Sequence, residues 1–169
     1  SRGLGDVYKR QVRGPLATRY VQQFLRNVAW GDVDFLILDL PPGTGDIQLT
    51  IVQTAELDGV VVVTTPQEVA LIDARKAIGL FERVETPILG IIENMSYFQC
   101  PSDGKIYHIF GEGGGEREAA KLGVPLLGKI PLDISTRFGG DEGRPVALED
   151  PGQNPVSAAF RQVAEQCAR

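Results

Sequence analysis

The sequence predicts an α/β protein in which helices flank a parallel sheet. Three observations lead to this prediction: short apolar runs typical of buried strands, longer helical patterns between them, and glycine or proline turns at the junctions. Strands that alternate with helices in this way are joined by right-handed crossovers, which produce a parallel sheet. The chain has 169 residues, so one domain is the default expectation.

The helices are predicted from apolar residues that recur at spacings of three and four, and the strands from continuous apolar or β-branched runs. The run GVVVVTT indicates a strand that is covered on both faces. The predicted helices are Pro15–Ala29, Asp46–Ala55, Gln67–Val84, Glu116–Leu122 and Asn154–Ala168. The predicted strands are Phe35–Asp39, Gly59–Thr65, Thr86–Glu93 and Val124–Ile130.

The most informative stretch is Val33–Asp46, VDFLILDLPPGTGD, where an apolar strand ends on the acid Asp39. A stiff proline pair and a glycine turn follow, and then a helical pattern begins. Parallel nucleotide-binding sheets present an acid to magnesium phosphate in this way, and glycine lets the backbone approach an anion closely. A capping role for Asp39 in the following turn is the alternative. The phosphate-cradling pattern G-x-x-x-x-G-K-[ST] does not occur in the 169 residues.

Composition excludes several classes of function. The net charge is −5, and the lysine and arginine residues are dispersed, so the sequence shows no basic patch of the kind that binds nucleic acid. No apolar run is long enough to span a bilayer, so no membrane partner is expected. The two cysteines, Cys100 and Cys167, lie far apart in the sequence, which favours a reducing compartment such as the cytoplasm.

The first eleven residues, SRGLGDVYKRQ, show no apolar periodicity. We interpret residues 1–11 as a cloning, sequencing-adapter or gene-call artefact, or as a disordered natural terminus, and residues 12–169 as the domain. Between Met95 and Gly115 the periodicity fails again, and a loop that long inside a domain is usually functional or mobile. Its GEGGG segment resembles a phosphate loop but lacks the lysine, so a flexible hinge is the preferred interpretation.

Several segments in the same order resemble the Mrp/ApbC family of P-loop ATPases, which are iron–sulfur cluster carriers related to the cell-division ATPase MinD. They are AWGDVDFLILDLPPGTGDIQLT, GVVVVTTPQEVAL, GIIENMSYFQCP, HIFGEGG, GKIPLD and GDEGRPV. The resemblance runs from Val12 to the C-terminus and implies a MinD-like P-loop NTPase fold, incomplete at the N-terminus. Family members carry a lysine-bearing phosphate loop on a strand upstream, beside the strand that ends at Asp39.

The resemblance also implies roles for individual residues. Asp39 would hold the hydration shell of Mg²⁺, and Asn94, directly after the third predicted strand, would contact the adenine edge of ATP; a turn cap is the alternative for Asn94. Pro131 would form a wall for the base, with Asp133 a weaker candidate beside it. The loop expected to sense the γ-phosphate is Pro42, Gly43, Thr44 and Gly45.

Many family members carry C-P-x-C in the loop after N-M-S, and two chains share one cluster across a dimer. Here the segment is Cys100-Pro101-Ser102-Asp103, so a carboxylate replaces the second thiol. Iron–sulfur centres usually need four good ligands, and neither Asp103 nor His108 is a soft one. Cluster binding through Cys100 and a thiol without metal therefore both stay open.

Three functions follow from the sequence. The first is an ATPase that binds ATP and Mg²⁺, forms a homodimer and passes iron–sulfur clusters to apoproteins. The second is a MinD-like switch whose output is dimerisation, without metal. The third is an inactive truncated product, because without phosphate-loop amides and lysine the Asp39 carboxylate faces an anionic ligand with no offsetting charge.

Overall fold

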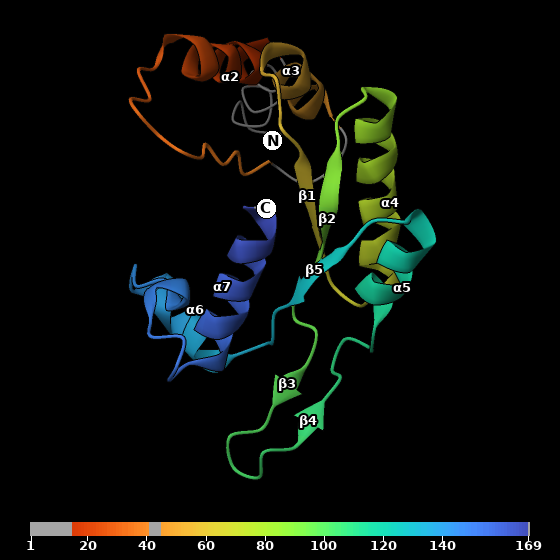
Figure 1. Cartoon of the computed structure of the whole chain (residues 1–169), viewed down its shortest axis with the longest axis vertical. Coiled ribbons are helices and arrows are strands. Elements are labelled where there is room, and N and C mark those ends of the chain that lie inside the picture. The colour runs from red at the N-terminus through yellow and green to blue at the C-terminus, as the bar shows by residue number, and fades with distance from the viewer. Residues whose placement is uncertain (1–14, 41–44, 169) are drawn as a thin grey trace, which may run out of the picture. The chain divides into compact units, whose positions relative to one another are not determined.

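The computed structural model describes residues 15–40 and 45–168. The chain divides into two compact units, Ser1–Asp58 and Gly59–Arg169. In the first unit, helix α2 (Pro15–Asn27) packs against helix α3 (Asp46–Thr54) (Figure 1). Gly45 is the N-cap residue of α3, and Asp46 is its first helical residue. Residues 1–11, Pro42, Gly43 and Thr44 lie outside the described residues.

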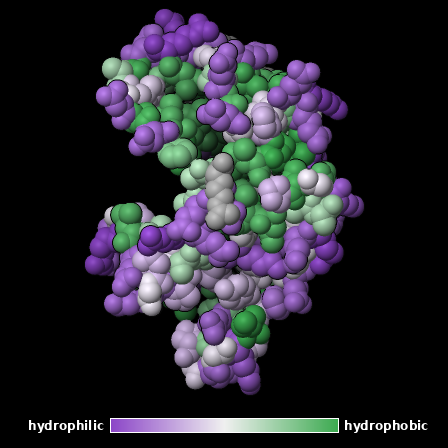
Figure 2. All heavy atoms as spheres, viewed as in Figure 1, coloured by the Kyte–Doolittle hydropathy of each residue, from purple (hydrophilic) through white to green (hydrophobic). Residues whose placement is uncertain are grey.

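The predicted strand Phe35–Asp39 is wrong for this structure, because residues 33–40 form neither helix nor strand. Phe35 is 67% exposed and Ile37 is 88% exposed. A strand persists only where its N–H and C=O groups pair with a neighbouring strand, and no strand of the described chain pairs with this segment. Figure 2 shows hydrophilic residues along the outer edge of this unit and hydrophobic residues directly beneath them.

The second unit contains a parallel three-stranded sheet in the order β1-β2-β5. The strands are β1 (Val60–Thr64), β2 (Ile88–Glu93) and β5 (Leu126–Lys129). Glu93 on the central strand is opposite Thr64 of β1 and Lys129 of β5. The parallel sheet with flanking helices confirms the predicted architecture, because the connections between these strands pass through helices.

Helices cover the two faces of this sheet unequally. Helices α4 (Glu68–Arg83) and α5 (Gly114–Leu122) pack on one face, and α7 (Pro155–Cys167) packs on β5 from the other. Successive strand residues point to opposite faces. Ile91 therefore joins the core under α4 and α5, and Ile92 joins the core under α7. Val63 of β1 remains 60% exposed, so within the described chain this strand is not covered on both faces as predicted.

The long non-periodic segment is a short antiparallel hairpin rather than an irregular loop. Strand β3 (Phe98–Gln99) pairs with β4 (Ile106–Tyr107), and the hairpin extends away from the sheet in Figure 1. Helix α6 (Ile134–Asp141) and the 3-10 helix Val146–Leu148 were not predicted either. These elements are too short, or too rich in glycine, to leave a periodic signal in the sequence.

Candidate functional site

The carboxyl ends of the three parallel strands meet at one edge of the sheet. The Asn94 N–H donates to the Thr64 carbonyl at 2.7 Å, which joins the end of β2 to the end of β1. The Ile130 N–H donates to the Glu93 carbonyl at 2.9 Å, which joins β2 to β5. Open α/β sheets bind ligands outside this edge, because the strand-to-helix loops leave a crevice there.

Asn94 begins a tight turn at this edge. Its Oδ1 accepts a hydrogen bond from the Met95 N–H at 2.9 Å, and Met95 has a left-handed backbone with φ of 53°. This is the turn-capping interaction we considered as the alternative for Asn94. The cap uses only the amide oxygen, and the Nδ2 group has no hydrogen bond to another described residue, so it is available to a ligand.

Thr65 is a candidate site residue that the sequence did not single out. Its Oγ1 is buried and is the one buried side-chain N or O atom of the described chain that lacks a hydrogen-bond partner. Thr65 follows β1 directly and precedes Pro66, so it lies at the same edge as Asn94. Buried hydroxyl groups are usually paired, so an unpaired one at a ligand-binding edge fits a polar contact with a ligand or water.

Pro131 and Asp133 follow β5 at this edge. Pro131 is buried, whereas the Asp133 carboxylate caps helix α6 by accepting from the Thr136 N–H at 3.0 Å and from the Ser135 hydroxyl. Burial opposes ionisation of Asp133, but the hydrogen bonds from Ser135 and Thr136 outweigh it and lower its pKa. The Asp133 carboxylate is thus already engaged in holding a helix.

Cys100 lies at the turn of the β3–β4 hairpin. The Cys100 N–H donates to the Lys105 carbonyl and the Gly104 N–H donates to the Cys100 carbonyl, both at 2.9 Å, which closes the turn. The half-buried Cys100 thiol lies 3.1 Å from the Ser102 hydroxyl, and this hydrogen bond lowers the pKa of Cys100. A lowered pKa increases the thiolate fraction, which is the form that attacks electrophiles and binds metal.

The two side chains considered as additional ligands beside Cys100 have other partners. Asp103 accepts from the Lys105 N–H at 3.0 Å, and this bond lowers the pKa of Asp103. His108 Nδ1 lies 3.4 Å from the Ser96 carbonyl, and its Nε2 lies 3.6 Å from Glu112 Oε1. No three His, Cys, Asp or Glu side chains of residues 15–40 and 45–168 gather closely enough to hold a metal ion.

A crevice of about 280 Å³ lies beside the hairpin. It brings together Cys100 and two residues predicted for the nucleotide edge, Pro131 and Asp133, whereas Asn94 does not line it. The residues lining it are Tyr97, Gln99, Cys100, Pro101, Gly104, Pro131, Leu132, Asp133, Pro155 and Val156. The hairpin therefore shares a surface with the segment that follows β5, an arrangement that spacing in the sequence could not reveal.

The GEGGG segment is the start of helix α5 and not a phosphate loop. Gly114 and Gly115 are buried in the first turn of that helix. The Gly115 N–H already donates to the Glu93 carboxylate at 2.6 Å. Because a protein carboxylate occupies this helix N-terminus, a phosphate there would meet like charge. This close packing also argues against our interpretation of the segment as a flexible hinge.

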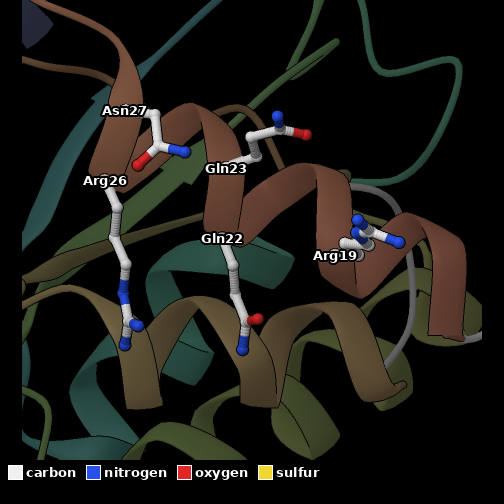
Figure 3. Close-up of a pocket in the computed structure, with 5 residues that line it drawn as sticks. All are labelled: Arg19, Gln22, Gln23, Arg26 and Asn27. Carbon is white, nitrogen blue, oxygen red and sulfur yellow. The ribbon is translucent and has the colours of Figure 1, made fainter.

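The remaining predicted residues belong to the Ser1–Asp58 unit. Asp39 is exposed in the segment without regular structure, and Gly45 caps α3. Their roles at a nucleotide site stay predictions. The same unit has a shallow hollow of about 330 Å³ whose lining comes from α2 (Figure 3): Arg19, Gln22, Gln23, Arg26 and Asn27. These residues form the polar face of one amphipathic helix, so the hollow is an ordinary solvated surface.

Known proteins resemble the chain closely. Curated relatives include two named "Iron-sulfur cluster carrier protein": one from Pyrococcus furiosus, 50% identical over 154 residues, and one from Escherichia coli K12, 49% identical over 156 residues. These alignments cover 91% and 92% of this chain but 52% and 42% of the relatives. The chain therefore spans about half the length of the curated relatives it matches.

Solved structures agree with this likeness. A nucleotide-binding protein from Archaeoglobus fulgidus, in complex with ADP, gives a TM-score of 0.69 at 43% identity, over 76% of this chain and 53% of that one. The cell division ATPase MinD from Pyrococcus furiosus gives a TM-score of 0.66 at 25% identity, over 89% of this chain and 58% of that one. The fold is thus that of the MinD-like P-loop NTPases.

None of the helices in the described part of the chain is both long enough and apolar enough to cross a membrane. A family profile described as "NUBPL iron-transfer P-loop NTPase" matches residues 9–168, which is nearly the whole chain. Together with the relatives at about half identity, this match shows that the chain belongs to the family of NUBPL iron-transfer P-loop NTPases.

Proposed function

We propose that this chain is part of an ATP-hydrolysing protein that carries iron–sulfur clusters to apoproteins. The names of the relatives support the cluster-carrying part of this proposal, and the ADP bound by the Archaeoglobus protein supports the nucleotide-binding part. The observation that carries it is the position of the hairpin. The end of β2 provides Asn94 to the carboxyl edge of the sheet and leads directly, within a few residues, into the hairpin that holds Cys100.

In the Gly59–Arg169 unit, the proposed nucleotide contacts lie at the carboxyl edge of the sheet. Asn94 and the unpaired Thr65 hydroxyl supply hydrogen bonds at the sheet edge, and Pro131 supplies an apolar wall for the base. The Asp39 carboxylate holds Mg²⁺ through water, and residues 42–45 contact the γ-phosphate. Bound Mg²⁺ supplies positive charge that offsets the triphosphate. The 169 residues contain no lysine-bearing phosphate loop, so we expect this chain by itself to bind ATP weakly.

The cluster is the proposed cargo. One chain offers a single hairpin thiol, Cys100, and a cluster needs about four ligands, so the proposed carrier is a homodimer in which two Cys100 thiolates face one cluster. The remaining positions are left to exchangeable ligands, which suits a carrier that must release its cargo. Cys100 and Cys167 are both free thiols, which fits a reducing compartment, and we propose a cytoplasmic location.

Anaerobic reconstitution with iron and sulfide tests the cargo proposal. The chain offers a matched control because Cys100 and Cys167 are its only cysteines. We expect visible absorbance of the reconstituted protein to persist in Cys167→Ala and to be lost in Cys100→Ala. Equal absorbance in both variants, or its loss only in Cys167→Ala, would remove Cys100 from the cluster site.

One observation favours a second candidate, a nucleotide-dependent dimerisation switch without metal. Asp103 stands where many members carry a second thiol, and it is engaged with Lys105. The likeness to MinD supports the same alternative. A protein that dimerises with ATP in size-exclusion chromatography, yet stays colourless after reconstitution, would favour the switch over the carrier.

A further inference from the structure

Glu93, at the end of β2, is a fully buried carboxylate with a solvent exposure of 0%. Its Oε1 accepts a hydrogen bond from the Ser96 hydroxyl at 2.5 Å, and its Oε2 accepts from the Gly115 N–H at 2.6 Å. Within the described residues, both of its hydrogen-bond donors are neutral groups. A buried carboxylate is costly unless its oxygens are satisfied, so this arrangement indicates a specific role.

The two donors lie at opposite ends of the Cys100 hairpin. Ser96 is where the chain leaves the sheet toward β3, and Gly115 is where it returns to begin α5. One carboxylate therefore closes the base of the whole 97–113 segment. His108, on the returning arm, adds a weaker contact because its Nδ1 lies 3.4 Å from the Ser96 carbonyl.

Helix α5 depends on the same carboxylate. Its N-cap residue, Gly113, has no side chain to satisfy the first N–H groups, and Glu93 supplies this cap from 22 residues earlier in the chain. A negative charge at a helix N-terminus is also favourable. The approach requires glycine, since a Cβ on Gly115 would lie 3.0 Å from Glu93 Cβ and one on Gly114 would lie 2.3 Å from the Pro66 carbonyl oxygen.

The backbone of Glu93 is fixed from both sides. It pairs in register with Thr64 of β1 and Lys129 of β5, and the next residue is Asn94. The Ser96 N–H donates to the Ile130 carbonyl at 3.0 Å, so the turn between Glu93 and Ser96 is held across the left-handed Met95. A rigid strand end thus connects the Asn94 turn, the hairpin base and the start of α5.

We propose that Glu93 is the positioning residue of the Cys100 hairpin: its carboxylate fixes the outgoing and returning arms to the end of β2. A change at the Asn94 turn is thereby passed to the hairpin through the Ser96 bond. This functional meaning rests on the proposed function, in which Asn94 contacts the nucleotide and Cys100 the cluster. The positioning itself requires neither ligand, so it is tested without them.

The test compares Glu93→Gln with Glu118→Gln in a Cys167→Ala background. Glu118 is a matched control because it is also a buried glutamate, on α5, but its side chain pairs with Arg75 of α4 and Lys121 of α5 rather than with hairpin residues. The measurements are hydrogen exchange of residues 98–107 and 113–117, the rate of Cys100 alkylation by iodoacetamide, and urea unfolding. None of them uses nucleotide or iron, so a failed carrier function leaves the result intact.

In Glu93→Gln the amide oxygen can accept from only one of the two donors, and the NH₂ group cannot accept from the other, so the charge and one of the two original hydrogen bonds are lost. We expect hairpin exchange and Cys100 alkylation to rise roughly 10-fold relative to Glu118→Gln, the effect of losing one charged hydrogen bond. Ser96→Ala should raise hairpin exchange while the Gly115 amide stays protected. It keeps the proposal testable if Glu93→Gln does not fold. Identical exchange patterns in Glu93→Gln and Glu118→Gln, or an unchanged hairpin in Ser96→Ala, would overturn the proposal.

Discussion

Two apolar runs of similar character have opposite fates in this chain. Val60–Val63 lies in strand β1 and pairs with β2, whereas Phe35–Leu38 remains without regular structure and its first three residues are exposed. Both runs satisfy the same sequence criterion for a buried strand. The difference lies in the partner: β1 lies beside β2 in its own unit, and no described strand pairs with the Phe35 segment. A segment with high strand propensity therefore forms a strand only where a neighbouring strand is available to hydrogen-bond with it.

The largest predicted effect is on ATP hydrolysis and concerns Asp39, at the end of the unpaired Phe35 segment. In the protein translated from the whole gene, we expect Asp39→Asn to lower magnesium-dependent ATP hydrolysis by roughly 10²-fold or more, as when one transition-state charge contact is lost. Circular dichroism should show an unchanged fold. Phosphate release at saturating ATP is the measurement, and unaltered turnover would remove Asp39 from the site.

Truncating one isoleucine from each unit sharpens the comparison. Ile91 is 0% exposed in the core under α4 and α5, so Ile91→Ala should lower the free energy of unfolding by about 2–5 kcal/mol. Ile37 is 88% exposed, so Ile37→Ala in this chain should change it by less than about 0.5 kcal/mol. Urea unfolding measures both. A cost of similar size at both positions would mean that Ile37 is buried in solution.

A partly buried ion pair between Arg75 and Glu118 also stabilises the Gly59–Arg169 unit. Arg75 donates to both oxygens of the buried Glu118 at 2.7 and 2.6 Å, which lowers the pKa of Glu118 below its ordinary 4.5. Glu118→Gln should therefore cost about 2 kcal/mol near neutral pH. Because the folded pKa is lowered, this stabilisation is present above pH 4.5 and is lost as the pH falls through the lowered pKa.

Thermal unfolding of wild type and Glu118→Gln between neutral and acidic pH measures this effect. The difference between the two proteins should shrink on acidification. A difference that is constant with pH would show that the charge of Glu118 contributes nothing.

The smallest predicted effect concerns the C-terminal ends of two helices in the Gly59–Arg169 unit. Helices α4 and α5 end in the same motif: the Thr86 N–H donates to the Phe81 carbonyl, and the Val124 N–H donates to the Ala119 carbonyl. The left-handed position is Glu85 in one, with φ of 56°, and Gly123 in the other, with φ of 69°. Glu85→Gly should raise the free energy of unfolding by about 0.5–1 kcal/mol, because glycine removes the left-handed strain.

Gly123→Ala is the matched control, since a Cβ there meets no atom within 4 Å and only the backbone conformation is affected. It should destabilise by about 1 kcal/mol. Opposite signs for the two substitutions confirm the motif, and a loss of stability in Glu85→Gly contradicts it.

The sequence predicted what depends on regular spacing. The parallel sheet, its flanking helices and the arrival of Asn94 and Pro131 at one edge follow from apolar periodicity and from the rule that parallel strands end together. It did not predict the β3–β4 hairpin, whose strands are two residues long. No pattern in the sequence pointed to Glu93, because its role depends on a hydrogen bond from Gly115. That residue lies 22 positions away in the sequence and comes close only in the tertiary structure.

The open side of β1 has a practical consequence. Within the Gly59–Arg169 unit this strand pairs only with β2, and Val60–Thr64 contains no lysine or proline, the residues that commonly block pairing at an exposed strand edge. An exposed, valine-rich edge strand of this kind can pair with strands of other chains and so promotes aggregation. Yield of the isolated chain should therefore fall as expression level rises, and a single lysine in place of the exposed Val63 should improve its solubility.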